Sequence, residues 1–125
     1  MTGWAASQSP SNAHVPQPIV STTANNPANL TCDSHGQPLS VCLWRSPAAN
    51  VINILGTAQD GQATAVPGIS YAGDGLNSGK CGLKIESIKD ADSGRWECTL
   101  IAQSGGTLFT GTVDVNILSK LCGRS

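Results

Sequence analysis

The segment from Cys81 to Leu100 limits most strongly what this chain can fold into, because it encodes two strands joined by one corner. Apolar and polar residues alternate on both sides of the turn formed by Asp90-Ala-Asp92-Ser-Gly94. The alternating apolar residues are Cys81, Leu83 and Ile85 before the turn and Trp96, Cys98 and Leu100 after it. Such alternation is typical of strands with one buried face. The segment therefore predicts two strands that bury one side each.

Two earlier residues complete a longer pattern. Cys32 ends one apolar run, and Trp44 follows twelve residues later. In an immunoglobulin sandwich, one cysteine lies on strand B, a tryptophan on strand C, and a second cysteine on strand F, two residues after a corner aromatic residue. Cys32, Trp44, Trp96 and Cys98 resemble that order. The resemblance implies an all-β, immunoglobulin-like Greek-key sandwich of two antiparallel sheets, with Trp44, Trp96, Leu83 and Ile85 in its core.

The turn signals divide the chain into seven main strands and one additional strand. We expect strand A from Ile19, B over 28–33, C over 39–45, E over 81–87, F over 94–103, and G through Val113, Val115 and Ile117. The apolar run 51–55 fits the C′ strand of a variable-type sandwich, and the Gly-rich region 61–80 holds at most one short D strand. We expect residues 18–118 to form the domain, residues 1–17 to be a disordered or loosely docked segment, and residues 119–125 to be a tail.

Five cysteines allow fifteen arrangements of two disulfides with one cysteine left over, so spacing alone does not choose among them. The immunoglobulin pattern pairs Cys32 with Cys98. Alternation places Cys42 on the inward face of strand C and Cys81 on the inward face of strand E, in opposite sheets, so these two should form a second inter-sheet disulfide. Cys122 remains single, either as a free thiol in the tail or as an intermolecular bridge.

Composition and motifs exclude several kinds of function. Seven basic and eight acidic residues give a net charge of -1, which provides no basic surface for nucleic acid. No apolar run approaches the roughly 18 to 20 residues of a membrane-spanning helix, so we expect no membrane insertion of this segment. No Gly-x-Ser-x-Gly, His-Glu-x-x-His or phosphate-loop motif occurs, so we expect no enzyme activity and no cofactor. We also expect no metal site, because Cys-x-x-Cys is absent and His14 and His35 lie in expected loops.

The cysteines indicate an oxidising, extracellular environment, either on a cell surface or in a secreted protein. We then expect that Met1 is not the native first residue, and that a signal peptide and further domains are missing from this sequence. Asn29-Leu30-Thr31 is the one Asn-x-Ser/Thr sequon in the chain. Its neighbours Leu30 and Cys32 should face the core, so Asn29 should face solvent as a candidate glycosylation site.

Residues 69–86 read Ile69-Ser-Tyr71-Ala-Gly73-Asp-Gly75-Leu76-Asn-Ser-Gly79-Lys-Cys81-Gly82-Leu-Lys-Ile85-Glu86. This stretch resembles the D to E segment of arthropod fasciclin III-type adhesion molecules. That family also has an extra cysteine near strand C, which Cys42 matches. The resemblance implies an extracellular adhesion or recognition domain without enzymatic activity, which in several members acts by self-association. The chain departs from the superfamily at Trp96, where a tyrosine is usual. It also has no Arg between Arg45 and Arg95 to pair with Asp92, so either Lys80 substitutes or the pair is absent.

A protein partner would bind most naturally on the sheet formed by strands C, F and G. Alternation directs Leu43 and Arg45 outward on strand C, and Arg95, Glu97, Thr99 and Ile101 outward on strand F. These residues give an apolar centre with a polar rim, which is typical of an interface, although isolated exposed Leu and Ile side chains are also normal. A C′ strand carrying Ile52 or Ile54 would extend this patch. The expected partner is the protein itself, as a homodimer, or another immunoglobulin-like domain.

A second hypothesis is a secreted immune or pattern-recognition domain. Such a domain would bind foreign ligands through loops 34–38 and 104–106, together with the C′ to D loop. The first two loops are short and contain no aromatic anchor. Catalysis is the least favoured of the three classes.

Overall fold

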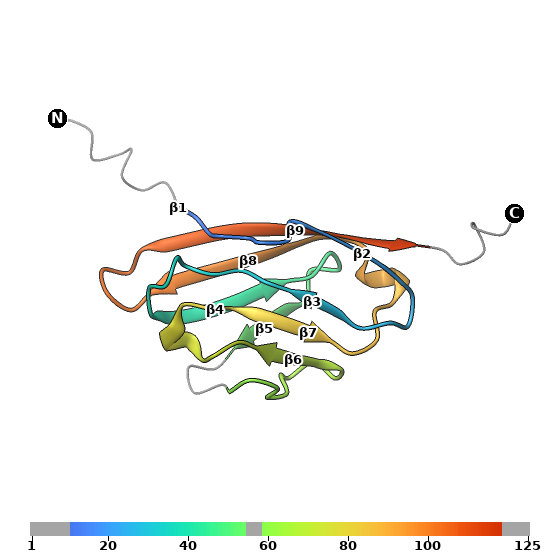
Figure 1. The fold of residues 1–125 in the computed structure, drawn as a ribbon, viewed down its shortest axis with the longest axis horizontal. Helices are drawn as coiled ribbons and strands as arrows, with labels where there is room; N and C mark the ends of the chain where they lie inside the picture. Colours follow the sequence, from blue (N-terminus) through green and yellow to red (C-terminus); the bar gives the residue numbers. More distant parts are fainter. Residues whose placement is uncertain (1–10, 55–58, 119–125) are drawn as a thin grey trace, which may run out of the picture.

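The computed structural model describes residues 11–54 and 59–118, which form two packed β-sheets (Figure 1). The larger sheet, called here the CFG sheet, runs in the order β1-β9-β8-β4-β5, and a further strand, β2, also pairs with β9. Its strands are β1 (Ser11–Asn12), β2 (Ile19–Thr23), β4 (Leu39–Arg45), β5 (Val51–Ile54), β8 (Gly94–Ala102) and β9 (Leu108–Leu118). The smaller sheet, called the BED sheet, has the order β3-β7-β6. Its strands are β3 (Ala28–Leu30), β6 (Ile69–Ala72) and β7 (Gly82–Ile85).

This architecture confirms the predicted immunoglobulin-like sandwich. Strand C has the expected bounds, and β5 and β6 are the expected C′ and D strands. The pairing is antiparallel except on one side of β9, where β1 and β2 run parallel to it. Leu55, the expected end of strand C′, lies outside the described residues, as do residues 1–10 and 119–125 with Cys122.

The N-terminal segment begins to pair earlier than the sequence indicated. Residues 11–17 were expected to be disordered or loosely docked, but Ser11 and Asn12 form β1 against β9. Ala13 then donates its backbone N–H to Thr110 O at 2.9 Å, and His14 exchanges two backbone hydrogen bonds with Asp33, at 2.8 and 2.9 Å. His14 Nδ1 also lies 3.0 Å from Asp33 Oδ2. Backbone pairing to both sheets therefore fixes a Pro-, Ser- and Asn-rich stretch that has little apolar side-chain area of its own.

The core between the two sheets contains the residues that the apolar alternation and the immunoglobulin spacing predicted to face inward. Trp44, Trp96, Leu83 and Ile85 are all buried. Both predicted disulfides are present, with Cα–Cα distances of 6.7 Å for Cys32–Cys98 and 5.7 Å for Cys42–Cys81. The indole Nε1 of Trp44 donates a hydrogen bond to Cys81 O at 3.1 Å. The second disulfide and the core tryptophan therefore both stabilise Cys81, directly before β7.

The corner between β7 and β8 uses Trp96 in place of tyrosine. Its indole Nε1 donates to Asp92 O at 2.9 Å, across the short 3-10 turn η3 (Asp90–Asp92). The Asp92 carboxylate accepts the backbone N–H of Lys89 at 2.8 Å. Of the two alternatives for Asp92, pairing with Lys80 is not found, because the Lys80 ammonium group lies 3.5 Å from Asp74 Oδ2.

Candidate protein-binding face

The outer surface of the CFG sheet combines side chains from four strands. Inward and outward positions alternate along β8 and, on β4, from Val41 to Arg45, after a register shift between Leu39 and Val41. The strand register places these outward residues in three cross-strand rows. They are Leu108–Ile101–Val41, then Thr110–Thr99–Leu43–Asn53, then Thr112–Glu97–Arg45–Val51.

The first row is apolar and lies at the end of the sheet nearest the β8–β9 turn. Leu108 is 36% exposed, and Ile101 and Val41 are partly buried by their neighbours. The predicted residue Leu43 lies in the second row, directly opposite Thr99, and diagonal to Ile101. The strand register therefore makes Leu108, Ile101 and Val41 cross-strand neighbours, with Leu43 close to them.

The third row is charged. Arg45 on β4 lies directly opposite Glu97 on β8, and both are exposed. Beyond this row Arg95 Nε lies 3.2 Å from Asp114 Oδ1. The Arg95–Asp114 ion pair is exposed, and such pairs contribute about 0 to 1 kcal/mol to stability. Their main effect is to give one end of the face a fixed pattern of charge, which favours selectivity more than folding.

The structure corrects one part of the predicted patch. Ile52 and Ile54 are buried, because they share the inward parity of Trp44 and Cys42, the residues opposite them on β4. The outward residues of β5 are Val51, which is 51% exposed, and Asn53. The strand therefore extends the face as predicted, but through its other two residues.

The sequence analysis also missed Val41 and Leu108. Val41 shares the outward parity of Leu43, so alternation alone could have identified it. Leu108 was missed because only the parity of Val113, Val115 and Ile117 was considered on strand G, whereas β9 begins at Leu108, which pairs with Ile101.

The loops at one end of the sandwich are held together by polar contacts. The Gln103 side-chain amide donates to Leu39 O at 3.1 Å and to Asn77 Oδ1 at 2.8 Å. Asn77 belongs to the 3-10 turn η2 (Leu76–Ser78). The backbone N–H of Ser34 donates to Gly79 O at 3.0 Å, and the Ser34 hydroxyl donates to Gln37 O at 2.5 Å. These bonds connect the loops before β4, before β7 and after β8, giving a preorganised polar surface without an apolar anchor.

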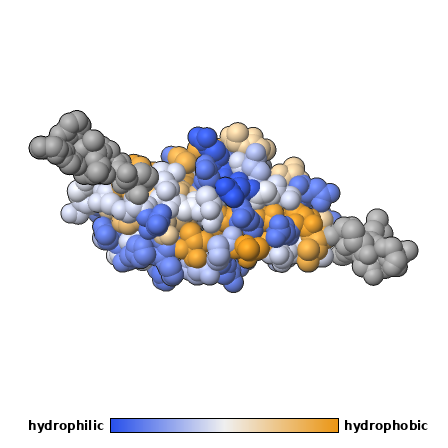
Figure 2. Space-filling view, turned by 90° about the horizontal axis from the view of Figure 1, so that it is seen from above, coloured by the Kyte–Doolittle hydropathy of each residue, from blue (hydrophilic) through white to orange (hydrophobic). Residues whose placement is uncertain are grey.

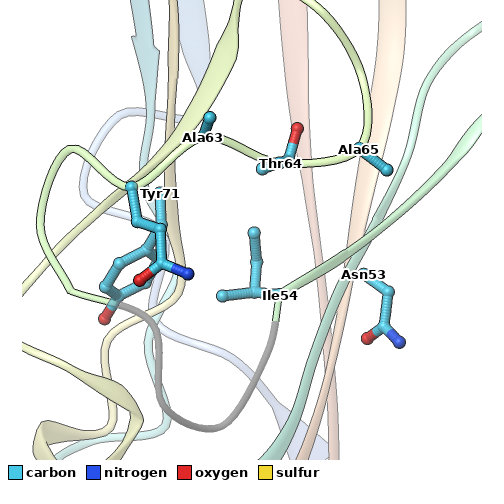
Figure 3. A pocket seen from close by; sticks show the side chains of 7 residues that line it. Asn53, Ile54, Ala63, Thr64, Ala65 and Tyr71 are labelled. Carbon is cyan, nitrogen blue, oxygen red and sulfur yellow. The ribbon is translucent and has the colours of Figure 1, made fainter.

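A separate cavity of about 250 Å³ lies at the open edge between β5 and β6 (Figure 3). Figure 3 shows Ile54 pointing toward Tyr71, with Ala63, Thr64 and Ala65 along one wall. The Tyr71 hydroxyl donates to Lys80 O at 2.9 Å and accepts the Gly75 N–H at 3.0 Å. Burial raises the pKa of Tyr71 above its ordinary value of 10.0. The hydroxyl is therefore neutral and already engaged, and the cavity offers mainly apolar walls.

A further apolar area lies along the edge formed by β2 and β9. Figure 2 shows hydrophobic residues gathered toward the right of the view. Ile19 is 61% exposed and Leu118 is 52% exposed, and they lie on the paired strands β2 and β9. This edge is distinct from the outer face of the CFG sheet.

Other kinds of site find little support within residues 11–54 and 59–118. No group of three or more His, Cys, Asp or Glu side chains in these ranges has the arrangement of a metal site. In the same ranges, no helix has the length and apolar character needed to cross a membrane.

Known proteins resemble this chain in part of its sequence and in its fold. A scan against protein-family models finds no match. The chain is 30% identical over 81 residues to Fasciclin-3 of Drosophila melanogaster, a match that covers 65% of this chain and 15% of that protein. The chain thus spans only a small part of the length of this relative.

Solved structures support the fold. A crystal structure of a chicken TCR superposes with a TM-score of 0.62 at 15% identity, covering 82% of this chain and 54% of that one. The titin M10–obscurin-like 1 Ig complex gives a TM-score of 0.58 at 16% identity, covering 87% and 96%. The predicted resemblances are confirmed: the chain has an immunoglobulin-like fold, and its sequence is similar to Fasciclin-3.

Proposed function

We propose that this domain is a non-enzymatic extracellular recognition domain that mediates cell adhesion through the outer face of its CFG sheet. The partner is a second copy of the domain or a related immunoglobulin-like domain. Two inter-sheet disulfides support an oxidising, extracellular environment. The similarity to Fasciclin-3 supports adhesion as the kind of function. The arrangement of side chains on the outer face of the CFG sheet supports contact through that face.

The observation that carries this proposal is the self-complementarity of the three rows. A twofold axis parallel to the strands and between β4 and β8 places β4 of one copy over β8 of the other. Val41 then meets Ile101 of the second copy, and Leu43 meets Thr99. Arg45 meets Glu97, and the reciprocal contacts repeat on the other side of the axis. Contacts repeated in this way are characteristic of twofold symmetric interfaces.

The chemistry of the face suits a weak and specific contact. The apolar row provides area to remove from water, and the charged row disfavours a copy docked in the reverse direction. A standard interface buries about 1,600 Å² in total, or about 800 Å² from each partner. Many copies presented on a surface convert weak individual contacts into firm adhesion.

The direct test is sedimentation velocity over a concentration series. Cys122→Ser serves as the background, because it removes disulfide-linked dimers. In that background, Ile101→Arg places a charge in the apolar row and should abolish concentration-dependent dimerisation. Ser70→Arg is the matched control, since Ser70 faces outward from the BED sheet and should leave dimerisation unchanged. A dimer that Ile101→Arg leaves intact would reject this face.

The loop end supports an alternative function, a secreted immune recognition domain. The hydrogen bonds of Gln103 and Ser34 preorganise the loops, which lowers the entropy cost of binding a ligand there. If the chain and its loop variant Gln103→Ala are both monomeric, and only the loop variant loses binding to a ligand, this alternative replaces the first. A ligand lost with Ile101→Arg and retained by Gln103→Ala supports the CFG face.

A further inference from the structure

We propose that Asn29 carries an N-linked glycan that covers the outer face of the BED sheet. Asn29-Leu30-Thr31 is the one sequon in the chain. Sequons also occur by chance, so the proposal rests on three structural observations at this position. It is independent of the proposed binding function.

The first observation is access. Asn29 lies on β3, is exposed, and points away from the core between the buried residues Ala28 and Leu30. Among the described residues, β3 pairs in the sheet only with β7, so its other edge carries no strand. A bulky group on the Asn29 amide therefore extends into solvent without disturbing the sandwich.

The second observation is the Thr31 hydroxyl. Its Oγ1 is buried and has no hydrogen-bond partner among the described residues. An unpartnered buried hydroxyl destabilises a fold, and valine has nearly the same shape without this penalty. Packing therefore gives no reason for a threonine here. The glycosylating enzyme gives such a reason, because it requires a hydroxyl two residues after the asparagine.

The third observation is the character of the surrounding surface. Two outward rows cross the BED sheet. One is Asn29–Lys84–Ser70, and the row beside it contains the pair Gly82 and Ala72. These side chains are polar or small. A hollow of about 200 Å³ lies next to Thr31 and is lined also by Pro16, Lys80 and Gly82. The inner sugars of a glycan fit over a surface of polar and small side chains, whereas a protein partner would find no large apolar side chain as an anchor.

The modification transfers a preformed oligosaccharide from a lipid diphosphate donor. The side-chain amide nitrogen of Asn29 forms a bond to the anomeric carbon of the first sugar and loses one proton. The bond between that carbon and the diphosphate oxygen breaks, and the lipid diphosphate leaves. No oxidant or reductant is involved. Because Asn29 lies on the sheet opposite the CFG sheet, the glycan leaves the outer CFG face free.

The test is intact mass spectrometry of the chain secreted from insect cells behind a cleavable leader, before and after peptide:N-glycosidase treatment. The unmodified sequence and Thr31→Ser should each lose the mass of one glycan on treatment. Asn29→Gln and Thr31→Val should show the mass of the polypeptide alone. If the unmodified sequence shows only the polypeptide mass while a co-secreted reference glycoprotein is modified, the proposal is wrong.

Thermal unfolding tests the argument from Thr31 separately. Asn29→Gln and Thr31→Val both lack the glycan, so their melting temperatures can be compared directly. Thr31→Val should melt at the same temperature as Asn29→Gln or at a higher one. A clearly lower value would show that the fold itself needs the hydroxyl, which would remove the structural basis of the proposal.

Discussion

The indole N–H of Trp96 donates to the backbone carbonyl of Asp92 at 2.9 Å and so closes the corner between β7 and β8. In related sandwiches a tyrosine hydroxyl makes a bond of this kind. Trp96 is buried, and its ring also fills the core beneath the corner. One side chain therefore provides both the packing and the polar contact at this position.

Replacing Trp96 with phenylalanine should destabilise the domain by about 1 to 3 kcal/mol beyond the loss of ring volume, because the Asp92 carbonyl loses its donor. Trp96→Tyr should recover part of this loss, since its hydroxyl can reach toward the same backbone. Chemical denaturation followed by circular dichroism measures both changes. Equal stability of the phenylalanine and tyrosine variants would show that the hydrogen bond contributes nothing.

The second disulfide should stabilise the domain without being required for the fold. Cys42→Ala combined with Cys81→Ala should lower the free energy of unfolding by about 2 to 4 kcal/mol, because the unfolded chain gains freedom. The Cys32–Cys98 bridge and the Trp44 hydrogen bond to the backbone carbonyl of residue 81 remain in this variant. Cys122→Ser is the matched control and should leave unfolding unchanged. A double variant as stable as the control would contradict this account.

Tyr71 provides a direct pH test, because it is the single tyrosine in the chain. Desolvation by burial raises its pKa above 10.0, and the negative charges of Asp74 and Asp60 add to that effect, while the hydrogen bond from Gly75 opposes it. The folded state therefore holds the phenolic proton more tightly than the unfolded state. Stability from this group is fully present below pH 10.0 and is lost as the pH rises through the folded-state pKa.

The corresponding measurement is an alkaline titration of tyrosinate absorbance in the folded protein and in denaturant. The folded transition should lie at the higher pH. Tyr71→Phe should remove the absorbance change and also weaken the alkaline loss of stability. Coincident folded and unfolded titrations would mean that the hydroxyl is not buried as described.

The sequence was most informative where a cysteine occupies an inward position of an alternating strand. Cys42 and Cys81 could be paired because each lies at an inward position of a strand, and the strands belong to opposite sheets. The pairing of Ser11 and Asn12 with β9 could not be predicted, because it depends on backbone hydrogen bonds that any sequence can form. Short polar strands have no hydrophobic periodicity, so periodicity does not predict them.

The outward positions of the candidate face were predicted on its two central strands and missed at its edges. Leu43, Arg45, Glu97, Thr99 and Ile101 follow from the parity of two long strands. Strand C′ is only four residues long, and both of its parities carry apolar side chains, so its inward side could not be chosen from the sequence. The pairing of Cys42 and Trp44 with Ile54 and Ile52 decides it.

The most direct test of the central claim is a charge-exchange experiment across the proposed twofold axis, in the Cys122→Ser background. Arg45→Glu alone and Glu97→Arg alone should each reduce dimerisation, because like charges then face each other. An equimolar mixture of the two variants should regain a dimer in sedimentation velocity, since each copy supplies the charge that the other lacks. A mixture that stays monomeric while the unmodified chain dimerises, or single variants that dimerise as strongly as the unmodified chain, would contradict the proposed interface.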